Sequence, residues 1–152
     1  MMTPAAHALD FPSEAWAREL SKRLAADPEI QAALAEFGPF TAGTIVEKGA
    51  GLSRDFCVHI EAAPGRETKL LFCEDEDELD DLDPNYLLRA PHGLARDLLR
   101  AALAGETPDP MKLLTSGQIK LRGDLSRVVR VGGRHPFAGL ATLRGLPTRT
   151  LG

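Results

Sequence analysis

Two cysteines and one histidine are the side chains whose types and spacing come closest to a site that could do chemistry. Cys57 and His59 are two residues apart, which puts both on one face of a strand, and Cys73 lies opposite them if the next apolar segment completes a hairpin. This trio could hold a soft metal ion, or His59 could activate a cysteine nucleophile. Structural zinc sites usually have four ligands, no Cys-x-x-Cys pair is present, and no third group orients the histidine. We therefore interpret the cysteines as two partly buried thiols beside a surface histidine.

Two further polar features fit ordinary structure better than a site. Residues 74–83 contain eight acidic side chains but lack the glycine and the spaced oxygen ligands of an EF-hand, so we predict a solvated acidic loop. His92 and Gly93 stand at a predicted helix start, where backbone amides favour anions, but a plain helix start is the simpler interpretation. The sequence has no glycine-rich phosphate loop, no Gly-x-Ser-x-Gly elbow and no His-Glu-x-x-His motif. We expect no cofactor, no metal and no enzyme activity.

The composition predicts one soluble domain. With 152 residues, of which 43% are apolar and 26% charged, the chain can bury a single sizeable core. No apolar run approaches the roughly 20 residues that cross a bilayer, and neither a secretory signal pattern nor a peroxisomal Ser-Lys-Leu ending is present. Two cysteines suit a reducing compartment. We expect a cytoplasmic protein with at most transient membrane contact, and the abundance of alanine, leucine and arginine suggests a bacterial source.

Charge is divided sharply between the two halves of the chain. Residues 1–73 carry a net charge of −3, whereas residues 84–152 contain eleven basic and four acidic side chains, a net charge of +7. Such a basic half attracts phosphates, fatty carboxylates or acidic protein patches, although it also fits a solvated face that the acidic run partly neutralises. Nucleic acid is disfavoured by the low pI, about 5.6, and by the lack of aromatic residues among the basic ones. The acidic loop at 74–83 and the basic C-terminal half are the candidate surfaces for a protein partner.

Local patterns predict the elements that would position these side chains. Residues 1–11 lack periodicity and are expected to be a flexible N-terminal arm, whereas residues 12–152 form a single domain. An apolar residue at every fourth position of residues 16–24 predicts a first helix, and residues 27–38 carry the start and stop residues of a second. Residues 40–46 are β-prone and begin a series of strands.

The next two strands allow a register to be predicted from side-chain alternation. If the hairpin closes around residues 64–66, one face of the strands at 56–62 and 68–73 becomes almost wholly apolar. A two-residue loop would mix these apolar side chains with polar ones. We therefore predict the three-residue loop, with Ala63 opposite Glu67.

The remaining elements complete a layered fold. After the acidic run, residues 86–90 are typical of a short strand, and Pro91 opens a helix whose leucines face inward while Arg96 and Arg100 point away. A last amphipathic helix is expected from Phe137 onward. Together these elements predict an α+β fold, in which helices pack on the apolar face of a largely antiparallel five-stranded sheet.

Residues 109–130 are the most informative stretch for the fold. An Asp-Pro pair at 109 starts a helix, Gly117 ends the turn that follows it, and residues 119–122 alternate as in a half-buried strand. A Gly-Asp pair then leads directly into another capped helix. Apolar elements thus follow one another with almost no polar loop between them.

This arrangement resembles the lipid-binding domain of the sterol carrier protein family, whose members carry a small-residue-Gly-x-[Ile/Leu]-x-[Ile/Leu]-x-Gly-Asp passage late in the domain. The matching residues are Ser116, Gly117, Ile119, Leu121, Gly123 and Asp124. Residues 83–103 look like the family's strand-then-helix passage, Trp16 stands where members often have an aromatic residue, and the resemblance covers roughly residues 12–146. The chain departs from the family in its acidic segment and in lacking a glycine before the fourth strand.

The resemblance implies that a long-chain lipid is held in an apolar tunnel between sheet and helices, with a nearby arginine at its head group and the C-terminal helix as a lid. By analogy, the candidate lipid-binding residues are Phe56, Val58, Ile60, Leu70, Phe72, Leu98, Leu114, Leu121, Val129, Phe137 and Leu140. A closed core would show the same pattern. Our leading hypothesis is a non-catalytic carrier of a fatty acid, acyl conjugate, phospholipid or polyprenyl quinone. The alternative is a scaffold or accessory subunit that binds a protein partner in a lipid-modifying or quinone-forming assembly.

Overall fold

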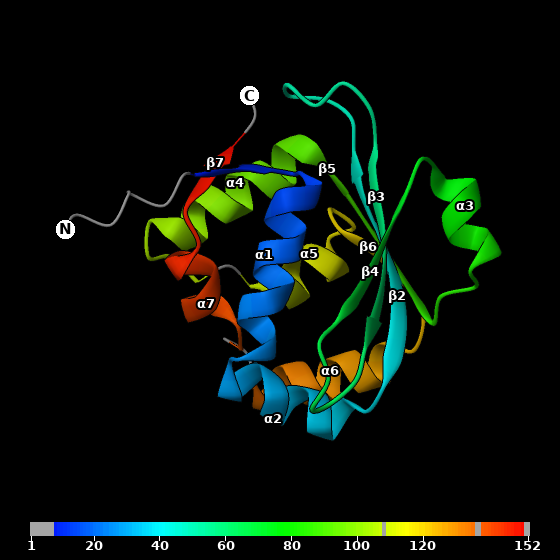
Figure 1. The fold of residues 1–152 in the computed structure, drawn as a ribbon, viewed down its shortest axis with the longest axis vertical. Helices are drawn as coiled ribbons and strands as arrows, with labels where there is room; N and C mark the ends of the chain where they lie inside the picture. The colour runs from blue at the N-terminus through cyan, green and yellow to red at the C-terminus, as the bar shows by residue number, and fades with distance from the viewer. Residues whose placement is uncertain (1–7, 108, 136–137, 151–152) are drawn as a thin grey trace.

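A five-stranded sheet forms the centre of the fold in the computed structural model, which describes residues 8–107, 109–135 and 138–150. Its strands are β2 (Phe40–Glu47), β3 (Phe56–Ala62), β4 (Lys69–Cys73), β5 (Tyr86–Pro91) and β6 (Lys120–Arg122). They lie in the order β4-β3-β2-β5-β6 (Figure 1). Three of the four pairings are antiparallel, and β2 pairs with β5 in parallel. The predicted largely antiparallel five-stranded sheet is therefore confirmed.

The hairpin of β3 and β4 has the predicted register. Ile60 pairs with Leu70, and the same register continued into the loop brings Ala63 opposite Glu67. The backbone N–H of Arg66 donates a hydrogen bond of 3.3 Å to the Ala63 carbonyl, which closes the turn. Because directly paired residues of antiparallel strands point to the same side, this register gathers the apolar side chains of both strands on one face.

Six of the described helices lie on that side of the sheet (Figure 1). They are α1 (Glu14–Ala25), α2 (Pro28–Phe37), α4 (His92–Leu103), α5 (Pro110–Thr115), α6 (Leu125–Arg134) and α7 (Leu140–Gly145). Four of them begin at a side-chain cap that accepts a hydrogen bond from a first-turn amide, namely Ser13, Asp27, Asp109 and Asp124. The sequence predicted the helix starts at the three aspartates. No helix in the described ranges is long and apolar enough to cross a bilayer.

A further helix, α3 (Glu76–Asp81), lies on the opposite face of the sheet and overturns the prediction of a solvated acidic loop. Its one leucine, Leu79, is 0% exposed and packs into a core cluster with Ile45, Cys57 and Leu87. The acidic side chains of the segment are exposed for the most part, so the segment is both solvated and helical. A single apolar anchor was not enough to reveal this helix in the sequence pattern.

An arginine adds a polar connection to the same helix. Arg89 of β5 donates hydrogen bonds to Glu76 of α3 and, at 3.3 Å, to Glu47 of β2. The hydrogen bond to Glu76 is the main cause that raises the pKa of Arg89 above its ordinary value. At the start of the helix, the Asp75 carboxylate accepts a 3.0 Å hydrogen bond from the Glu78 amide.

The two ends of the described chain meet in a small parallel pair of strands. Here β1 (Leu9–Phe11) pairs with β7 (Thr148–Thr150). Residues 9–11 therefore do not belong to a flexible arm, as had been expected, and residues 1–7 lie outside the described residues. Three residues are too few to show strand periodicity, and their pairing partner is at the other end of the sequence.

Candidate functional site

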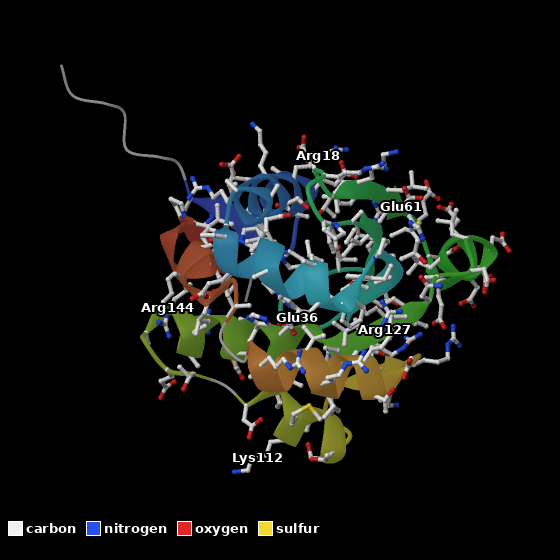
Figure 2. All side chains as sticks on the ribbon, turned by 90° about the horizontal axis from the view of Figure 1, so that it is seen from below. Arg18, Glu36, Glu61, Lys112, Arg127 and Arg144 are labelled. Atoms are coloured by element: carbon white, nitrogen blue, oxygen red, sulfur yellow. The ribbon has the colours of Figure 1, made fainter. Side chains whose placement is uncertain are left out.

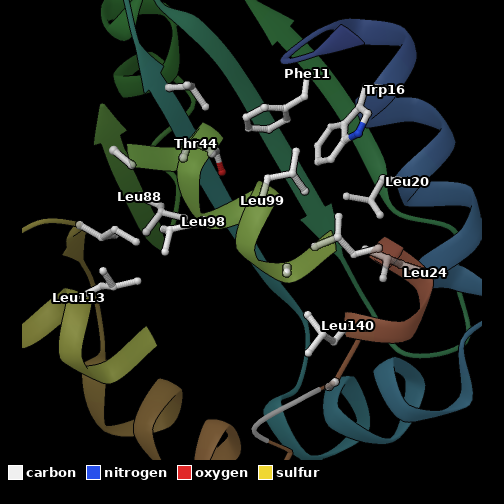
Figure 3. A pocket seen from close by; sticks show the side chains of 18 of the residues that line it. Phe11, Trp16, Leu20, Leu24, Thr44, Leu88, Leu98, Leu99, Leu113 and Leu140 are labelled. Atoms are coloured by element: carbon white, nitrogen blue, oxygen red, sulfur yellow. The ribbon is translucent and has the colours of Figure 1, made fainter. Parts of the chain in front are cut away.

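A cavity of about 540 Å³ lies between the sheet and helices α1, α4, α5 and α7 (Figure 3). Its volume falls within the roughly 300–1,000 Å³ range of small-molecule sites. The lining is apolar apart from one hydroxyl group and one indole N–H. The lining residues are Phe11, Trp16, Leu20, Leu24, Ile30, Thr44, Ile45, Val46, Leu88, Ala90, Ala95, Leu98, Leu99, Ala102, Leu113, Ile119, Ala138, Gly139, Leu140 and Leu143.

The floor of the cavity is the middle of the sheet. Thr44 and Val46 of β2 lie beside Leu88 and Ala90 of β5, their partners in the parallel register. Alternate residues of a strand face the same side of a sheet, so these four side chains point together toward the helices. The central strand, β2, is paired with β3 on one side and β5 on the other, which engages its backbone polar groups in the sheet.

Helix α4 forms one wall. Ala95, Leu98, Leu99 and Ala102 all line the cavity, and their spacing of three and four residues puts them on one face of the helix. The two alanines leave room where larger side chains would fill the space between helix and sheet. The sequence predicted that the leucines of this helix face inward, and Leu98 and Leu99 line the cavity.

Helix α1 and strand β1 cover the cavity from another side. Trp16, Leu20 and Leu24 line it at four-residue intervals, and Phe11 packs edge-on against Trp16 with their ring centroids 4.7 Å apart. The indole N–H of Trp16 donates a 3.0 Å hydrogen bond to the Thr148 hydroxyl, so this polar group is already satisfied within the protein. An amphipathic helix thus supplies a wholly apolar surface to the cavity.

No charged side chain is among the lining residues in the described part of the chain. Arg144 of α7 lies close by but donates to the carbonyls of Ala102, at 2.7 Å, and Glu106, at 3.0 Å. Lys112 stands next to the lining residue Leu113 in the sequence but projects away from the body of the molecule (Figure 2). The arginine that was expected to meet a lipid head group therefore has no counterpart among the described lining residues.

The predicted lipid-binding residues fall into three groups. Leu98 and Leu140 line the cavity. Five others face the same side of the sheet but lie beside the cavity, on the two strands that precede the acidic run; they are Phe56, Val58, Ile60, Leu70 and Phe72. Helix α1 approaches these strands, since the Arg18 guanidinium sits 4.9 Å from the centroid of the Phe72 ring. Phe137 lies outside the described residues.

The third group lines a separate groove of about 390 Å³ between α5, β6 and α6. Leu114, Leu121 and Val129 belong to it. Met111, Leu125 and Val129 are 36%, 47% and 47% exposed, so three large apolar side chains with high exposure gather in this groove. Ile119 lines both this groove and the cavity, so the two hollows adjoin.

Several lining residues were predicted to face inward but were not assigned to a site. Trp16, Leu20, Leu24 and Leu99 belong to helices whose apolar spacing was evident in the sequence. Leu113 follows the Asp-Pro helix start and was likewise expected to face inward. What could not be found from spacing is that these helices stand over β2 and β5 with space beneath them, because that depends on how far each helix is held from the sheet.

In the cysteine and histidine trio, Cys57 and His59 are buried and Cys73 is half-buried. Cys57 and Cys73 are directly opposite each other across β3 and β4. His59 is only 6% exposed, so the expectation of a surface histidine was wrong. Burial raises the pKa of the Cys57 thiol to about 11 and also raises that of Cys73, which keeps both thiols protonated at neutral pH. Within the described ranges, no group of three or more His, Cys, Asp and Glu side chains is arranged to hold a metal ion.

His92 at the start of α4 is fully buried. Its Nδ1 lies 2.7 Å from the Gly49 carbonyl oxygen and donates to it, which ties the helix to the turn after β2. This contact is structural and agrees with the interpretation of the segment as a plain helix start.

Comparison with known proteins identifies solved structures with a similar fold. No protein-family model matches the sequence, and no curated protein matches it either. A conserved hypothetical protein from Thermus thermophilus, described as possibly a sterol carrier protein, shares 15% identity, with a TM-score of 0.64 over 97% of each chain. A crystal structure of sterol carrier protein 2 shares 18% identity, with a TM-score of 0.61 over 88% of this chain and 97% of the other. The chain therefore has the fold of the sterol carrier proteins.

Proposed function

We propose that this protein is a non-catalytic carrier that binds a long-chain lipid in the cavity between its sheet and helices. The observation that carries the proposal is the cavity itself, which has about 540 Å³ of space and, among the described residues, a lining without charged side chains. A hydrocarbon chain gains about 0.8 kcal/mol for each methylene that it transfers from water into such surroundings. The structural likeness to proteins described as sterol carriers supports the same conclusion.

The chemistry of the lining supports a carrier rather than an enzyme. The lining residues of the described chain offer neither a general acid or base nor a nucleophile with a base beside it. The cysteines, whose thiols could react in principle, lie under α3 on the other face of the sheet. Binding is the activity that the lining residues can support.

Lipid capture by the purified protein tests the proposal. Native mass spectrometry should detect a co-purified lipid, or the lipid-free protein should take up a long-chain lipid with a fluorescent label. In Ala95→Phe, the added ring enters the cavity and displaces about two methylenes of the chain, so uptake should weaken about tenfold. Asp97→Phe is the matched control, because Asp97 is exposed on the same helix and should leave uptake unchanged. A protein that neither carries nor takes up lipid, or equal uptake by the two variants, would refute the proposal.

The α5–β6–α6 groove favours a second candidate function, an accessory subunit that docks on a protein partner. Exposed apolar side chains that gather in one groove often mark interaction sites. Lys120 lines the groove and Lys112 lies on the adjoining helix, so the matching partner has an acidic surface around an apolar anchor. A lipid-free protein that forms a stable complex, lost in Leu125→Asp, would favour this candidate over the carrier.

A further inference from the structure

Thr44 occupies a central position on the floor of the cavity. It lies in the middle of β2, the central strand of the sheet, with Val58 of β3 and Leu88 of β5 as its direct neighbours. Both neighbours are apolar, and Leu88 also lines the cavity. Figure 3 shows the Thr44 side chain among the lining residues, with its oxygen pointing into the cavity.

The Thr44 hydroxyl forms no hydrogen bond with any residue that the structure describes. Other threonine hydroxyls of the fold are engaged: that of Thr41 accepts from the Asn85 amide at 2.9 Å, and that of Thr148 accepts from Trp16. The indole N–H of Trp16 is satisfied, and the β2 backbone is paired on both sides. Among the described residues, Thr44 therefore carries the one side-chain polar group that faces the cavity without a protein partner.

No charged side chain is among the described lining residues, and the two arginines next to Leu24 and Leu143 in the sequence donate to backbone carbonyls. The Arg144 guanidinium donates to the carbonyls of Ala102 and Glu106. Arg23 donates to the Gly145 carbonyl at 2.7 Å and pairs with Glu19. These carbonyls leave the charge of Arg144 in place, but Arg144 does not line the cavity. A carboxylate or phosphate buried among the lining residues would lose its water without a counter-charge among them, which disfavours the ionised form.

We infer that the cavity selects an uncharged long-chain lipid with a single hydrogen-bonding oxygen function, such as an alcohol, ketone or ester, and that Thr44 recognises this oxygen. The inference rests on the proposed lipid-binding function and names its ligand class. The threonine hydroxyl can donate to a carbonyl oxygen or accept from an alcohol, so it fits all three groups. One hydrogen bond of this kind changes affinity about fivefold.

A matched ligand series tests this inference with the intact protein. Trp16 lines the cavity and is the single tryptophan of the chain, so its fluorescence reports ligand entry without a label. The ligands are hexadecane, hexadecanol, methyl hexadecanoate and hexadecanoate at neutral pH, each kept below its aggregation concentration. The alcohol and the ester should bind about fivefold more tightly than the alkane, and the carboxylate should bind least.

Two variants test whether the Thr44 hydroxyl causes the difference in affinity between these ligands. Thr44→Val keeps the shape of the side chain but lacks the hydroxyl, so the alcohol and the ester should lose their roughly fivefold advantage over the alkane. Thr44→Ser keeps the hydroxyl and should retain the preference. Thr44→Val should also raise the Tm of the empty protein, because it removes an unpaired hydroxyl from apolar surroundings.

The possible outcomes separate the inference from the function on which it rests. Carboxylate binding as tight as alcohol binding, or an unchanged preference in Thr44→Val, overturns the inference and leaves lipid binding standing. If none of the four ligands enters the cavity and no lipid co-purifies, both the inference and the proposed function are overturned.

Discussion

The indole N–H of Trp16 donates a hydrogen bond of 3.0 Å to the hydroxyl of Thr148 and joins α1 to β7 across 132 positions of the sequence. Thr148 in turn donates to the Leu146 carbonyl at 2.9 Å, and β7 pairs with β1. The two ends of the described chain are therefore held together beside the cavity, next to a residue that lines it.

A double-mutant cycle measures how much this hydrogen bond contributes to the free energy of unfolding. Trp16→Phe and Thr148→Val should each lower the free energy of unfolding, because each leaves the other polar group without its partner. The coupling energy should be about 1 kcal/mol, measured by urea unfolding of the two single variants and the double variant. Strictly additive effects would show that the contact contributes nothing to stability.

Leu79 should anchor the acidic helix to the sheet. It is fully buried in the cluster under α3, so Leu79→Ala should lower the free energy of unfolding by about 2–5 kcal/mol. Leu82, just past the same helix, is 40% exposed, and Leu82→Ala should cost less than about 1 kcal/mol. Chemical denaturation measures the free energy of unfolding of both variants. If the two variants lost similar amounts, the result would contradict the burial of Leu79 between α3 and the sheet.

Cys57 should make stability depend on pH in the alkaline range. Burial is the main cause that raises the pKa of its thiol from 9.0 to about 11, and the negative charge of Asp55 acts in the same direction. Below pH 9 the thiol keeps its proton whether the chain is folded or unfolded, so its ionisation does not affect stability there. Between pH 9 and 11 the unfolded chain loses this proton first, and the free energy of unfolding therefore falls as the pH rises.

The Cys57→Ala variant isolates this contribution. At pH 8 it should be less stable than the wild type, since it leaves a small void in the core. The difference should narrow as the pH rises from 9 to 11, because only the wild type carries the titrating thiol. Unfolding curves at several pH values give the result, and a constant difference would show that the thiol does not titrate as its burial implies.

Most of the elements could be predicted from local patterns because their causes are local. The caps at Asp27, Asp109 and Asp124 satisfy amides two or three residues away, and the β3–β4 register follows from alternation within one hairpin. The acidic helix escaped prediction for the opposite reason. Its formation depends on the contact of Leu79 with Ile45, which lies on a strand more than thirty positions earlier.

The candidate site could likewise be predicted only in part. The apolar face of β3 and β4 was correctly predicted, yet the cavity lies over β2 and β5, where Thr44, Val46 and Leu88 form its floor. Apolar side chains that fill a core and those that line a hollow obey the same alternation. Over β4 the Arg18 side chain of α1 covers the Phe72 ring, whereas over β2 and β5 helix α4 presents the small side chains of Ala95 and Ala102 to the cavity.

The sequence by itself determined most of the elements, their inward faces and the hairpin register, because hydrophobic alternation and capping act between near neighbours along the chain. The sterol carrier fold was indicated by the resemblance of residues 109–130 to that family. Tertiary structure alone decided the rest: the pairing of β1 with β7, the burial of His59, the helix under the acidic run, and the placement of an unpaired Thr44 hydroxyl in a cavity whose described lining is uncharged. Each of these depends on distances between elements that are far apart in sequence. Such distances are set by the packing of the whole domain.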